Sequence, residues 1–326
     1  IQTKNNSMVK IYDILIIGAG PAGLTAAIYG VRAGRSVLVV GGQTPGGQLM
    51  LTTDVEDYPG FIDAVQGPEL VQRMREQAKR LGAEFFDDNV TNVNFKASPF
   101  TIETAEKKKF SAKSCIIAVG SAYKWLGIPS ELKFKGNGIS TCAVCDGYFF
   151  KNRDVAVIGG GDTAMREALF LSKICKTVNV IHRRDVLRAQ SVLQERAKAT
   201  KNIKWVWNSD VQEFLGDKKL TGIKIKNNKS NQMSTLKVDG AFVAIGHEPA
   251  TGFLKGQLAL DSKGYVAVKG GYTETSVPGV FVAGDVRDFR YQQAITAAGF
   301  GCMAAMDADS FLHGFRNISE TARKGK

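Results

Sequence analysis

The sequence predicts an α/β fold with two Rossmann-like units, because one strand, glycine turn, helix and strand pattern occurs in it twice. The chain has 326 residues, enough for two domains of ordinary size. Apolar residues make up 44% and charged residues 23%, as in folded soluble proteins. Its 35 glycines exceed the roughly 23 expected from average usage. The backbone must therefore turn tightly, or approach another group closely, at several places.

The first unit begins with the apolar run Ile11–Ile17, which predicts a strand. The Ala-rich segment Pro21–Arg32 follows as a helix, with proline in its first turn and Gly34 after its end. The β-branched segment Ser36–Val40 predicts the second strand. These three elements form one β-α-β unit.

The turn of this unit reads Gly18-Ala19-Gly20-Pro21-Ala22-Gly23, the spacing of a dinucleotide-binding fingerprint. Gly18 permits the tight turn, Gly20 lets the backbone reach a pyrophosphate, and Gly23 lets the helix pack on the strand. The acidic residue that usually binds the ribose is missing, since the second strand ends in Gly41-Gly42-Gln43. We therefore expect backbone groups or Gln43 to hold this ribose. The alternative is an empty glycine-rich turn.

The second unit repeats the pattern with a strand at Asp154–Ile158, a helix at Thr163–Lys173 and a strand at Thr177–Ile181. Its turn is Gly159-Gly160-Gly161-Asp162-Thr163-Ala164, where alanine in the last place also allows close helix packing. The same anion-binding geometry is predicted here.

Basic residues follow the second strand of this unit, in His182-Arg183-Arg184 and at Arg188. Arginine at this place gives charge-assisted contacts to a 2′-phosphate, so NADPH is favoured over NADH. A solvated basic strand end is the alternative. Two dinucleotide sites require two different dinucleotides, and we expect the other to be FAD, which accepts the hydride of NADPH.

The remaining segments continue the α/β pattern. Leu70, Met74, Ala78 and Leu81 share one face of an amphipathic helix. Further strands are predicted at Phe85–Phe86, Val90–Phe95, Phe100–Thr104, Ser114–Val119, Ile203–Trp207, Val211–Leu215, Leu220–Ile225, Gly240–Ile245 and Val280–Ala283, a turn at Lys226–Gln232 and a helix at Gln293–Leu312. Short linkers are expected near Tyr123–Pro129 and Gly246–Gly252.

A pair of cysteines, Cys142 and Cys145, lies just before the second unit, with Asp146 directly after it. Cysteines at this spacing can close a small disulfide and lower the pKa of one thiol, which suits reversible exchange. A zinc site would need a second close Cys/His pair, and the sequence has none, so no metal is expected. A structural disulfide would gain little from so small a loop, and inert buried thiols would not need an adjacent acid.

With both fingerprints, this cysteine pair resembles the low-molecular-weight thioredoxin reductases, which are class II pyridine nucleotide-disulfide oxidoreductases. The resemblance runs from about Ile11 to Leu312. It is also carried by Gly46-Gly47-Gln48-Leu49, Val55–Gly60, Ile116–Gly120, Cys142–Gly147, His182–Asp185, Ala244–His247, Gly279–Asp285 and Gln293–Gly299.

The resemblance implies two Rossmann-like FAD/NAD(P)-binding three-layer domains, with the NADPH domain at residues 123–252 inserted into an FAD domain at residues 1–122 and 253–326. It implies hydride transfer from NADPH to FAD, reduction of the Cys142–Cys145 disulfide, and reduction of oxidised thioredoxin by the dithiol. In family terms Cys145 lies nearer the flavin, Cys142 attacks the partner and Asp146 donates a proton. Asp285 resembles the acid that holds the ribityl chain of the flavin.

The expected cofactor contacts follow the same motifs. For FAD they are Gly18, Gly20, Pro21, Ala22, Gly23, Gly46, Gly47, Gln48, Asp57, Gly120, Gly284, Asp285, Gln293 and Ala294, and for NADPH they are Gly159, Gly161, Asp162, Thr163, His182, Arg183, Arg184 and Arg188. Four positions depart from the family pattern, namely Asp57, Val119, Arg166 and Gln292.

Three other functions compete with this interpretation. A related dithiol oxidase would pass electrons to oxygen, but it needs no NADPH and hence no basic cluster after the second unit. A flavin reductase subunit of a peroxiredoxin system would need further N-terminal domains, which we do not expect before Ile11. A nucleic-acid-binding protein could use the net charge of +12, but these lysines and arginines are scattered, so a solvated surface is expected.

The compartment and the assembly are also expectations. An odd count of five cysteines leaves at least one thiol free, and the first ten residues lack the apolar stretch of a secretory signal. No apolar run is long enough for a membrane span. We therefore expect a cytoplasmic protein that binds neither membrane nor nucleic acid and, from the resemblance, a homodimer.

Overall fold

The computed structural model describes residues 10–43, 45–51, 54–270 and 272–314. The expectation about a secretory signal at the start of the chain falls on residues 1–9, outside this range. The chain divides into two compact units. Unit 1 comprises Ile1–Ala122 and Glu248–Lys326, and unit 2 is Tyr123–His247. Where the chain passes between them, β9 (Ser121–Tyr123) and β18 (His247–Pro249) pair as a two-stranded sheet.

Unit 1 is built on a seven-stranded sheet with the order β5-β2-β1-β8-β7-β6, in which β19 also pairs with β8. The strands around β1 (Ile11–Ile17) are parallel, whereas β6, β7 and β8 form an antiparallel meander. The other members are β2 (Val37–Val40), β5 (Glu84–Phe86), β6 (Val90–Asn94), β7 (Phe100–Thr104), β8 (Lys109–Ile117) and β19 (Val280–Val282). Two short strands, β3 (Asp54–Val55) and β4 (Val65–Gln66), pair beside it.

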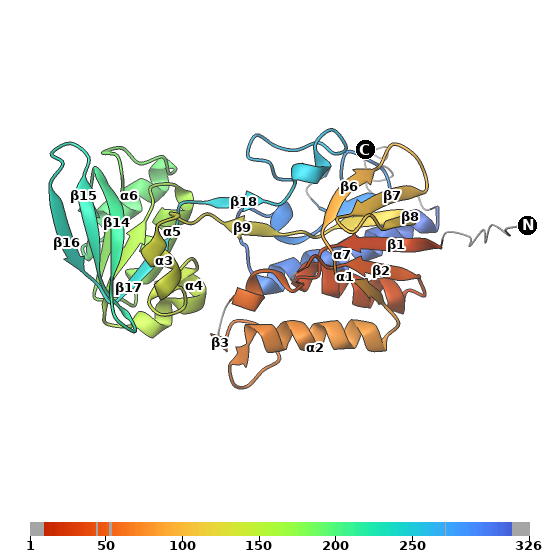
Figure 1. Ribbon diagram of the computed structural model, residues 1–326, viewed down its shortest axis with the longest axis horizontal. Helices are drawn as coiled ribbons and strands as arrows, with labels where there is room; N and C mark the ends of the chain where they lie inside the picture. Colours follow the sequence, from red (N-terminus) through yellow and green to blue (C-terminus); the bar gives the residue numbers. More distant parts are fainter. Residues whose placement is uncertain (1–9, 44, 52–53, 271, 315–326) are drawn as a thin grey trace, which may run out of the picture. The chain divides into compact units, whose positions relative to one another are not determined.

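Helices cover one face of this sheet (Figure 1). The helix α1 (Pro21–Arg32) packs against α7 (Ala294–Leu312) and α2 (Gly67–Arg80). Alanines and glycines on α1 and α7 let the two helices approach closely, as Gly301 shows, since a Cβ there would lie 2.1 Å from the Ala22 carbonyl oxygen. The opposite face is covered by apolar side chains that include Phe95, Phe100, Leu254 and Leu258.

Unit 2 has three layers. Its five-stranded parallel sheet has the order β10-β17-β11-β12-β13, with α5 (Asp162–Leu171) on one face. An antiparallel meander of β14, β15 and β16 covers the other face, packed through Phe214, Ile223 and Ile225 (Figure 1). The strands are β10 (Ile139–Ser140), β11 (Asp154–Ile158), β12 (Thr177–Ile181), β13 (Ile203–Val206), β14 (Ser209–Gly216), β15 (Leu220–Asn227), β16 (Met233–Lys237) and β17 (Gly240–Val243), and the further helices are α3 (Pro129–Phe134), α4 (Ala143–Asp146) and α6 (Ser191–Ala199).

Both predicted β-α-β units are present with bounds close to those expected. The helices α3, α4 and α6 and the strand β16 were not predicted from the sequence. The strand β16 has no alternation of apolar and polar residues that could predict it, because Met233 to Lys237 are mostly exposed. It forms through backbone pairing with β15. The predicted turn at Lys226–Gln232 begins inside β15, which extends to Asn227.

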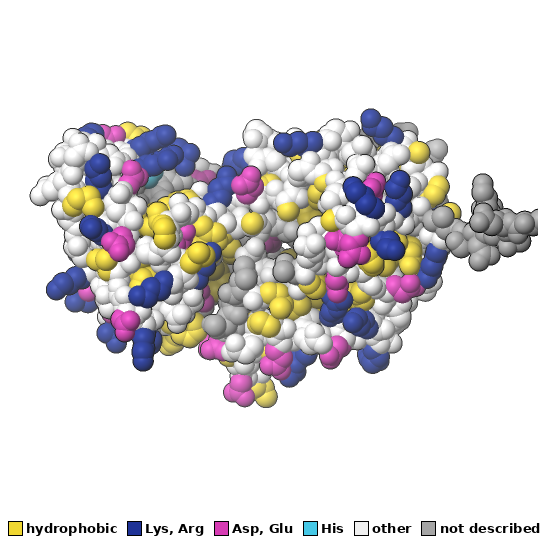
Figure 2. All heavy atoms as spheres, viewed as in Figure 1, with side chains coloured by type: hydrophobic (Ala, Val, Ile, Leu, Met, Phe, Trp, Pro, Cys, Tyr) yellow, Lys and Arg dark blue, Asp and Glu magenta, His cyan; other side chains and the backbone are white. Residues whose placement is uncertain are grey.

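Two further findings concern the charged side chains on the surface and the length of the apolar helices. Lys and Arg side chains are spread over the visible face of each unit, with Asp and Glu side chains among them (Figure 2). None of the helices that the structure describes is long and apolar enough to cross a membrane.

Candidate redox and dinucleotide-binding sites

The structure joins Cys142 and Cys145 by a disulfide, with their Cα atoms 5.4 Å apart. Cys142 is the N-cap of the one-turn helix α4, and Cys145 lies within that turn. The backbone N–H of Cys145 donates a hydrogen bond to Sγ of Cys142, 3.2 Å away. An N–H aimed at sulfur favours the thiolate once the bond is reduced.

The other three cysteines are free thiols. Burial raises the pKa of the Cys115 thiol far above its usual value and that of Cys175 to about 11, so both stay protonated and unreactive. Cys302 is partly exposed on α7. No three His, Cys, Asp or Glu side chains in the described part of the chain are placed to hold a metal ion.

Asp146 ends α4, and its backbone N–H donates to the Cys142 carbonyl at 3.1 Å. Its Oδ2 accepts a hydrogen bond of 2.5 Å from the hydroxyl of Ser140, the last residue of β10. The structure therefore brings Asp146 and both cysteines together within one helical turn and connects them to a strand of the parallel sheet.

The second glycine turn lies between β11 and α5. Gly159 has φ +153°, and a Cβ there would lie 2.3 Å from the Ala244 carbonyl oxygen. A Cβ at Gly160 would lie 2.3 Å from the His182 ring. Gly161, the N-cap of α5, faces open space, with no heavy atom within 4 Å of such a Cβ. Side chains at Gly159 and Gly160 would therefore collide with the rest of unit 2, whereas Gly161 leaves space where a phosphate would approach the backbone.

The predicted basic cluster gathers at this turn. The backbone N–H of Arg188 donates to the Gly160 carbonyl at 2.8 Å. Burial lowers the pKa of His182, and the charges of Arg188, Arg184 and Arg183 lower it further, so all three arginines lie near this ring. Among the residues described, none of the three guanidinium groups pairs with a carboxylate. This concentration of uncompensated positive charge suits a 2′-phosphate.

Asp162 and Thr163 lie in the first turn of α5. The Asp162 carboxylate accepts the backbone N–H of Gln190 at 2.8 Å and its side-chain amide at 3.4 Å. It therefore fastens the segment that carries the arginines to the glycine turn, which is a positioning role that the sequence did not suggest.

The first glycine turn, in unit 1, is built alike. A Cβ at Gly18 (φ +115°) would lie 2.2 Å from the Ala118 carbonyl oxygen, and one at Gly23 would lie 1.9 Å from the Gly18 carbonyl oxygen. Gly20, the N-cap of α1, is open, and the nearest atom to a Cβ there is the Gly46 carbonyl oxygen at 3.8 Å. Pro21 follows as the first residue of α1.

Segments distant in sequence come together around this turn. Gly46 and Gly47 adopt positive φ and bring the 3₁₀ turn Gly47–Leu51 next to Gly20. Gln48 donates from its side-chain amide to the Ser121 carbonyl at 3.3 Å, beside Gly120, which also has positive φ. These predicted flavin contacts therefore occupy one region of unit 1.

Gly284 and Asp285 follow β19 and reach the same region, since a Cβ at Gly284 would lie 2.9 Å from the Cβ of Ala22. Burial, together with the charge of Asp288, raises the pKa of Asp285 to about 7. Its Oδ1 is buried and has no hydrogen-bond partner within the described residues. A buried, unsatisfied carboxyl beside a backbone cradle fits a ligand that brings hydroxyl groups, such as the ribityl chain of a flavin.

The predicted contacts Gln293 and Ala294 begin α7. Gln293 is the N-cap of this helix, and the backbone N–H of Gln293 donates a hydrogen bond to the hydroxyl of Thr296 as part of a capping box. Gln292 has φ +52°, and its side-chain amide donates to the Ser121 hydroxyl at 3.4 Å. The residue thus connects the start of α7 to the segment after β8.

Comparison with known proteins decides the family. The model of the pyridine nucleotide-disulphide oxidoreductases matches residues 12–301. The chain belongs to this family. The thioredoxin reductase of Streptomyces coelicolor is 51% identical over 306 residues, which are 94% of this chain and 95% of that protein. The thioredoxin reductase of Rickettsia conorii is 48% identical over 303 residues, covering 92% and 98%.

Solved structures agree with these matches. The thioredoxin reductase from Giardia duodenalis superposes with a TM-score of 0.89 at 39% identity, over 93% of this chain and 99% of that chain. The enzyme from Streptococcus pyogenes MGAS5005 gives a TM-score of 0.87 at 40% identity, over 94% and 99%. The predicted fold class and the resemblance to low-molecular-weight thioredoxin reductases are confirmed.

Three positions that depart from the family pattern do not join the site through any contact seen among the described residues. Asp57 is exposed in the loop between β3 and β4. Val119 packs with the core on the face of the sheet opposite α1, and Arg166 is exposed on α5. The structure gives no account of their effect on this pyridine nucleotide-disulphide oxidoreductase.

Two residues near the redox pair were missed. Ser140 lies two positions before Cys142, and this closeness in the sequence is the only signal that could have predicted its role. Glu167 lies on the buried side of α5 with its carboxyl near the backbone N–H of Ala143, between the two cysteines. Burial raises its pKa to about 8, and its Oε2 has no partner in the described structure. Nothing in the sequence signals this second acid.

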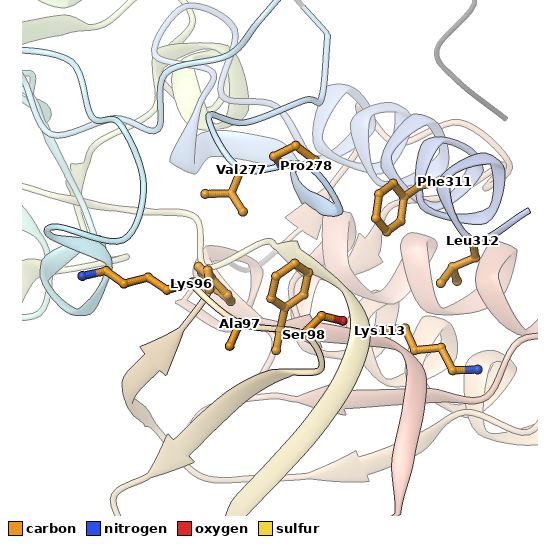
Figure 3. Close-up of a pocket in the computed structure, with 10 residues that line it drawn as sticks. Lys96, Ala97, Ser98, Lys113, Val277, Pro278, Phe311 and Leu312 are labelled. Atoms are coloured by element: carbon orange, nitrogen blue, oxygen red, sulfur yellow. The ribbon is translucent and has the colours of Figure 1, made fainter. Parts of the chain in front are cut away.

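Unit 1 also has a cavity of about 500 Å³ away from its glycine turn. Val277 and Pro278 lie on one side of it, next to Phe311 and Leu312 of α7, with Lys96 and Lys113 at its ends (Figure 3). Val277 and Pro278 precede β19, whereas Gly284 follows it, so the cavity is at the opposite end of this strand from the predicted flavin contacts.

Proposed function

We propose that this chain is an NADPH-dependent thioredoxin-disulfide reductase whose Cys142–Cys145 dithiol reduces oxidised thioredoxin. The observation that carries the proposal is the disulfide on α4, a helix packed against α5, which itself begins at the second glycine turn. One unit thus combines a redox-active pair with a nucleotide-type turn. Relatives of almost equal length that are named thioredoxin reductases support it.

We place FAD at the first glycine turn, in unit 1, and NADPH at the second, in unit 2. The open backbone at Gly20 and the unsatisfied Oδ1 of Asp285 support the flavin site. The open backbone at Gly161 and the unpaired arginines support the NADPH site. When bound, the two cofactors would supply the hydride whose two electrons open the disulfide.

The dithiol then exchanges with the partner in two steps. The Cys142 thiolate attacks one sulfur of the partner disulfide, so that an S–S bond forms between the proteins and the other partner sulfur leaves. The Cys145 thiolate next attacks Sγ of Cys142, which closes the enzyme disulfide and releases the second partner sulfur. Two electrons pass to the partner, and the two protons lost by the cysteines are those gained by its thiols.

Asp146 is suited to move these protons. Its carboxyl shares one helical turn with both sulfurs, so it can take a proton from a thiol that becomes nucleophilic and return it to a leaving sulfur. Cys142 is the better nucleophile because the Cys145 N–H stabilises negative charge on its sulfur.

Exposed apolar side chains beside the disulfide support a protein substrate. Val144 is 50% exposed, Tyr148 63% and Phe149 56%, all within α4 and the 3₁₀ turn that follows it. Exposed apolar and aromatic side chains that lie close together in the chain are typical of protein interfaces. A dithiol oxidase acting on small molecules would not need it, nor would such an enzyme need the unpaired arginines.

The proposal includes the assembly and the compartment expected from the sequence. Tyr29 on α1 and Ile295 and Met306 on α7 are exposed apolar groups that a second copy of unit 1 could cover, which supports a homodimer. Three free thiols support a reducing compartment such as the cytoplasm. Sedimentation velocity at several concentrations measures the assembly.

The deciding experiment follows NADPH oxidation with thioredoxin and insulin. Cys142→Ser and Cys145→Ser should each lower turnover by about 10³-fold or more, because each removes one sulfur of the pair. Both variants should keep the yellow flavin spectrum. The matched control is Cys302→Ser, a partly exposed free cysteine in unit 1, which should turn over like the wild type.

The oxidase alternative is tested in the same preparation. Oxygen consumption on dithiols that exceeds NADPH-dependent thioredoxin reduction would contradict the proposal, as would a purified protein that is colourless and binds no flavin on reconstitution.

A further inference from the structure

We infer that Ser140 is a positioning residue of the redox site, which orients Asp146 and holds it in the ionised form through a hydrogen-bonded chain starting at Cys142. Only the catalytic meaning of Asp146 rests on the proposed function, since the hydrogen-bonded chain is a property of unit 2 itself.

The chain runs through one hydroxyl group. The backbone N–H of Cys142 donates to Oγ of Ser140 at 3.0 Å, and the Ser140 hydroxyl donates to Oδ2 of Asp146 at 2.5 Å. A hydroxyl that accepts from one donor and donates to a carboxylate is polarised in both bonds, which strengthens each. The Cys142 carbonyl, at 3.4 Å from the same oxygen, is a weaker competitor for the proton.

Ser140 is itself held rigidly. It is 8% exposed and belongs to β10, whose residues Ile139 and Ser140 pair in parallel with Ala241 and Phe242 of β17. The hydroxyl is therefore anchored to the central sheet, whereas α4 is a single turn that cannot orient its own side chains firmly. The sheet thus fixes the acid through Ser140.

The acid end of α4 is also fastened through its backbone, because the Asp146 N–H donates to the Cys142 carbonyl at 3.1 Å. With main chain and Oδ2 both fixed, the carboxyl keeps one position relative to the two sulfurs. A hydroxyl donated to the charged form of a carboxyl favours that form, so the Ser140 bond makes Asp146 harder to protonate.

One other carboxyl lies against this helix, that of Glu167 on α5, near the Ala143 N–H. The remaining charged groups of α5 are Asp162, which is bonded to Gln190, and the exposed Arg166. The Tyr148 phenol and Lys151 lie on the segment after α4. A test must therefore separate Asp146 from Glu167.

The readout is the pH dependence of iodoacetamide alkylation of Cys142 and Cys145 in the dithiothreitol-reduced holoenzyme. It needs neither thioredoxin nor turnover. We expect a low-pH inflection from Asp146 that Asp146→Asn abolishes and Glu167→Gln leaves in place. In Ser140→Ala this inflection should move up by about one pH unit, the value of one hydrogen bond to a charged group. Ser140→Thr, which keeps the hydroxyl, should restore it.

A double-mutant cycle shows whether Ser140 acts through Asp146. In the Asp146→Asn background, Ser140→Ala should change the profile no further. The matched control is Ser209→Ala, another buried serine of unit 2, whose hydroxyl bonds the Trp207 carbonyl at 2.8 Å. It should leave the inflection in place.

Three results would overturn the inference: an inflection that survives Asp146→Asn, one that stays put in Ser140→Ala, or a Ser140→Ala shift of equal size with and without Asp146. Failure of the proposed function would appear separately, as a wild-type protein that shows the alkylation profile but does not reduce thioredoxin.

Discussion

The two glycine turns have nearly the same backbone and different surroundings. In each, the first glycine faces a strand-end carbonyl oxygen, which a Cβ would approach to 2.2 Å at Gly18 and 2.3 Å at Gly159, and the glycine at the helix N-cap is open. Beyond the turn the units diverge. Unit 1 adds a buried carboxyl, Asp285, whereas unit 2 adds three unpaired arginines. Under the proposed function, the backbone would hold a pyrophosphate in both turns, and the added side chains would decide which dinucleotide binds.

The arginines give the largest expected effect. Replacing Arg183, Arg184 and Arg188 together by Gln should raise the KM for NADPH by about 10³-fold, since each charge-assisted contact contributes about 1.5 kcal/mol. The KM for NADH should change by less than about 3-fold, because NADH lacks the 2′-phosphate. Steady-state kinetics with both nucleotides measure this.

The control for the arginines is Arg196→Gln, an exposed arginine on α6 of the same unit. It lowers the net charge without touching the cluster, so both KM values should stay at wild-type levels. Equal losses for NADPH and NADH in the triple variant would mean that the cluster does not read the 2′-phosphate.

The glycines give the next effect, and here the comparison predicts two outcomes in each turn. Gly18→Ala and Gly159→Ala should each destabilise their own unit by about 3 kcal/mol, because φ is positive and the methyl group meets a carbonyl oxygen. Gly20→Ala and Gly161→Ala have φ −79° and −99° and open space, so stability should change little. Dinucleotide affinity should fall instead, by about 10-fold or more.

Urea unfolding and flavin or nucleotide titration of all four variants measure these outcomes. If Gly20→Ala unfolds the protein as readily as Gly18→Ala, the distinction between a blocked and an open glycine does not hold.

The same two turns show what the sequence can predict. Spacing and flanking apolar runs were sufficient for β1, α1, β11 and α5, because local hydrophobic periodicity and glycine sterics determine these elements. The cysteine pair and the arginine cluster were also recognisable, since their chemistry depends on residue type at short spacing.

What the sequence did not reveal depends on long-range contacts. Ser140 bonds Asp146 because β10 pairs with β17, a strand about a hundred residues later. Glu167 is buried because α5 packs on α4. Asp162 is predicted to contact NADPH, and tertiary structure adds Gln190 as a further partner of its carboxylate. A single sequence contains no signal for such pairings.

The buried carboxyl of Asp285 gives the next effect, which is on flavin affinity. Asp285→Asn keeps the shape and removes the acceptor charge, so flavin affinity should fall by about 30-fold, with NADPH affinity in unit 2 unchanged. Fluorescence titration of the apoprotein measures the first and nucleotide titration the second. Asp261→Asn is the matched control, since its Oδ1 accepts the backbone N–H groups of Lys263 and Tyr265 in the same unit. It should lose stability more than flavin affinity.

Among the described residues, each unit has one buried acid whose pKa is raised, and this gives the smallest effect. Burial raises the pKa of Glu167 in unit 2 from 4.5 to about 8 and that of Asp285 in unit 1 from 3.8 to about 7. The folded protein then holds protons that the unfolded chain has lost, so stability falls as pH rises from the unfolded to the folded pKa. Burial lowers the pKa of His247 to about 4 and also lowers that of His182, so both add a slope of opposite sign, which fades as pH rises above the unfolded value of 6.5.

Between pH 6.5 and 8 the free energy of unfolding should therefore decrease by about 1–2 kcal/mol through Glu167, measured by urea titration of the apoprotein. Glu167→Gln, which keeps the shape of the side chain and cannot ionise, should remove this part of the slope, and Asp285→Asn should flatten only the portion below about pH 7. Flavin should suppress the Asp285 portion alone, because it supplies the partner that Oδ1 lacks. A slope that survives both substitutions would assign the pH dependence to other groups and leave the two buried acids without energetic consequence.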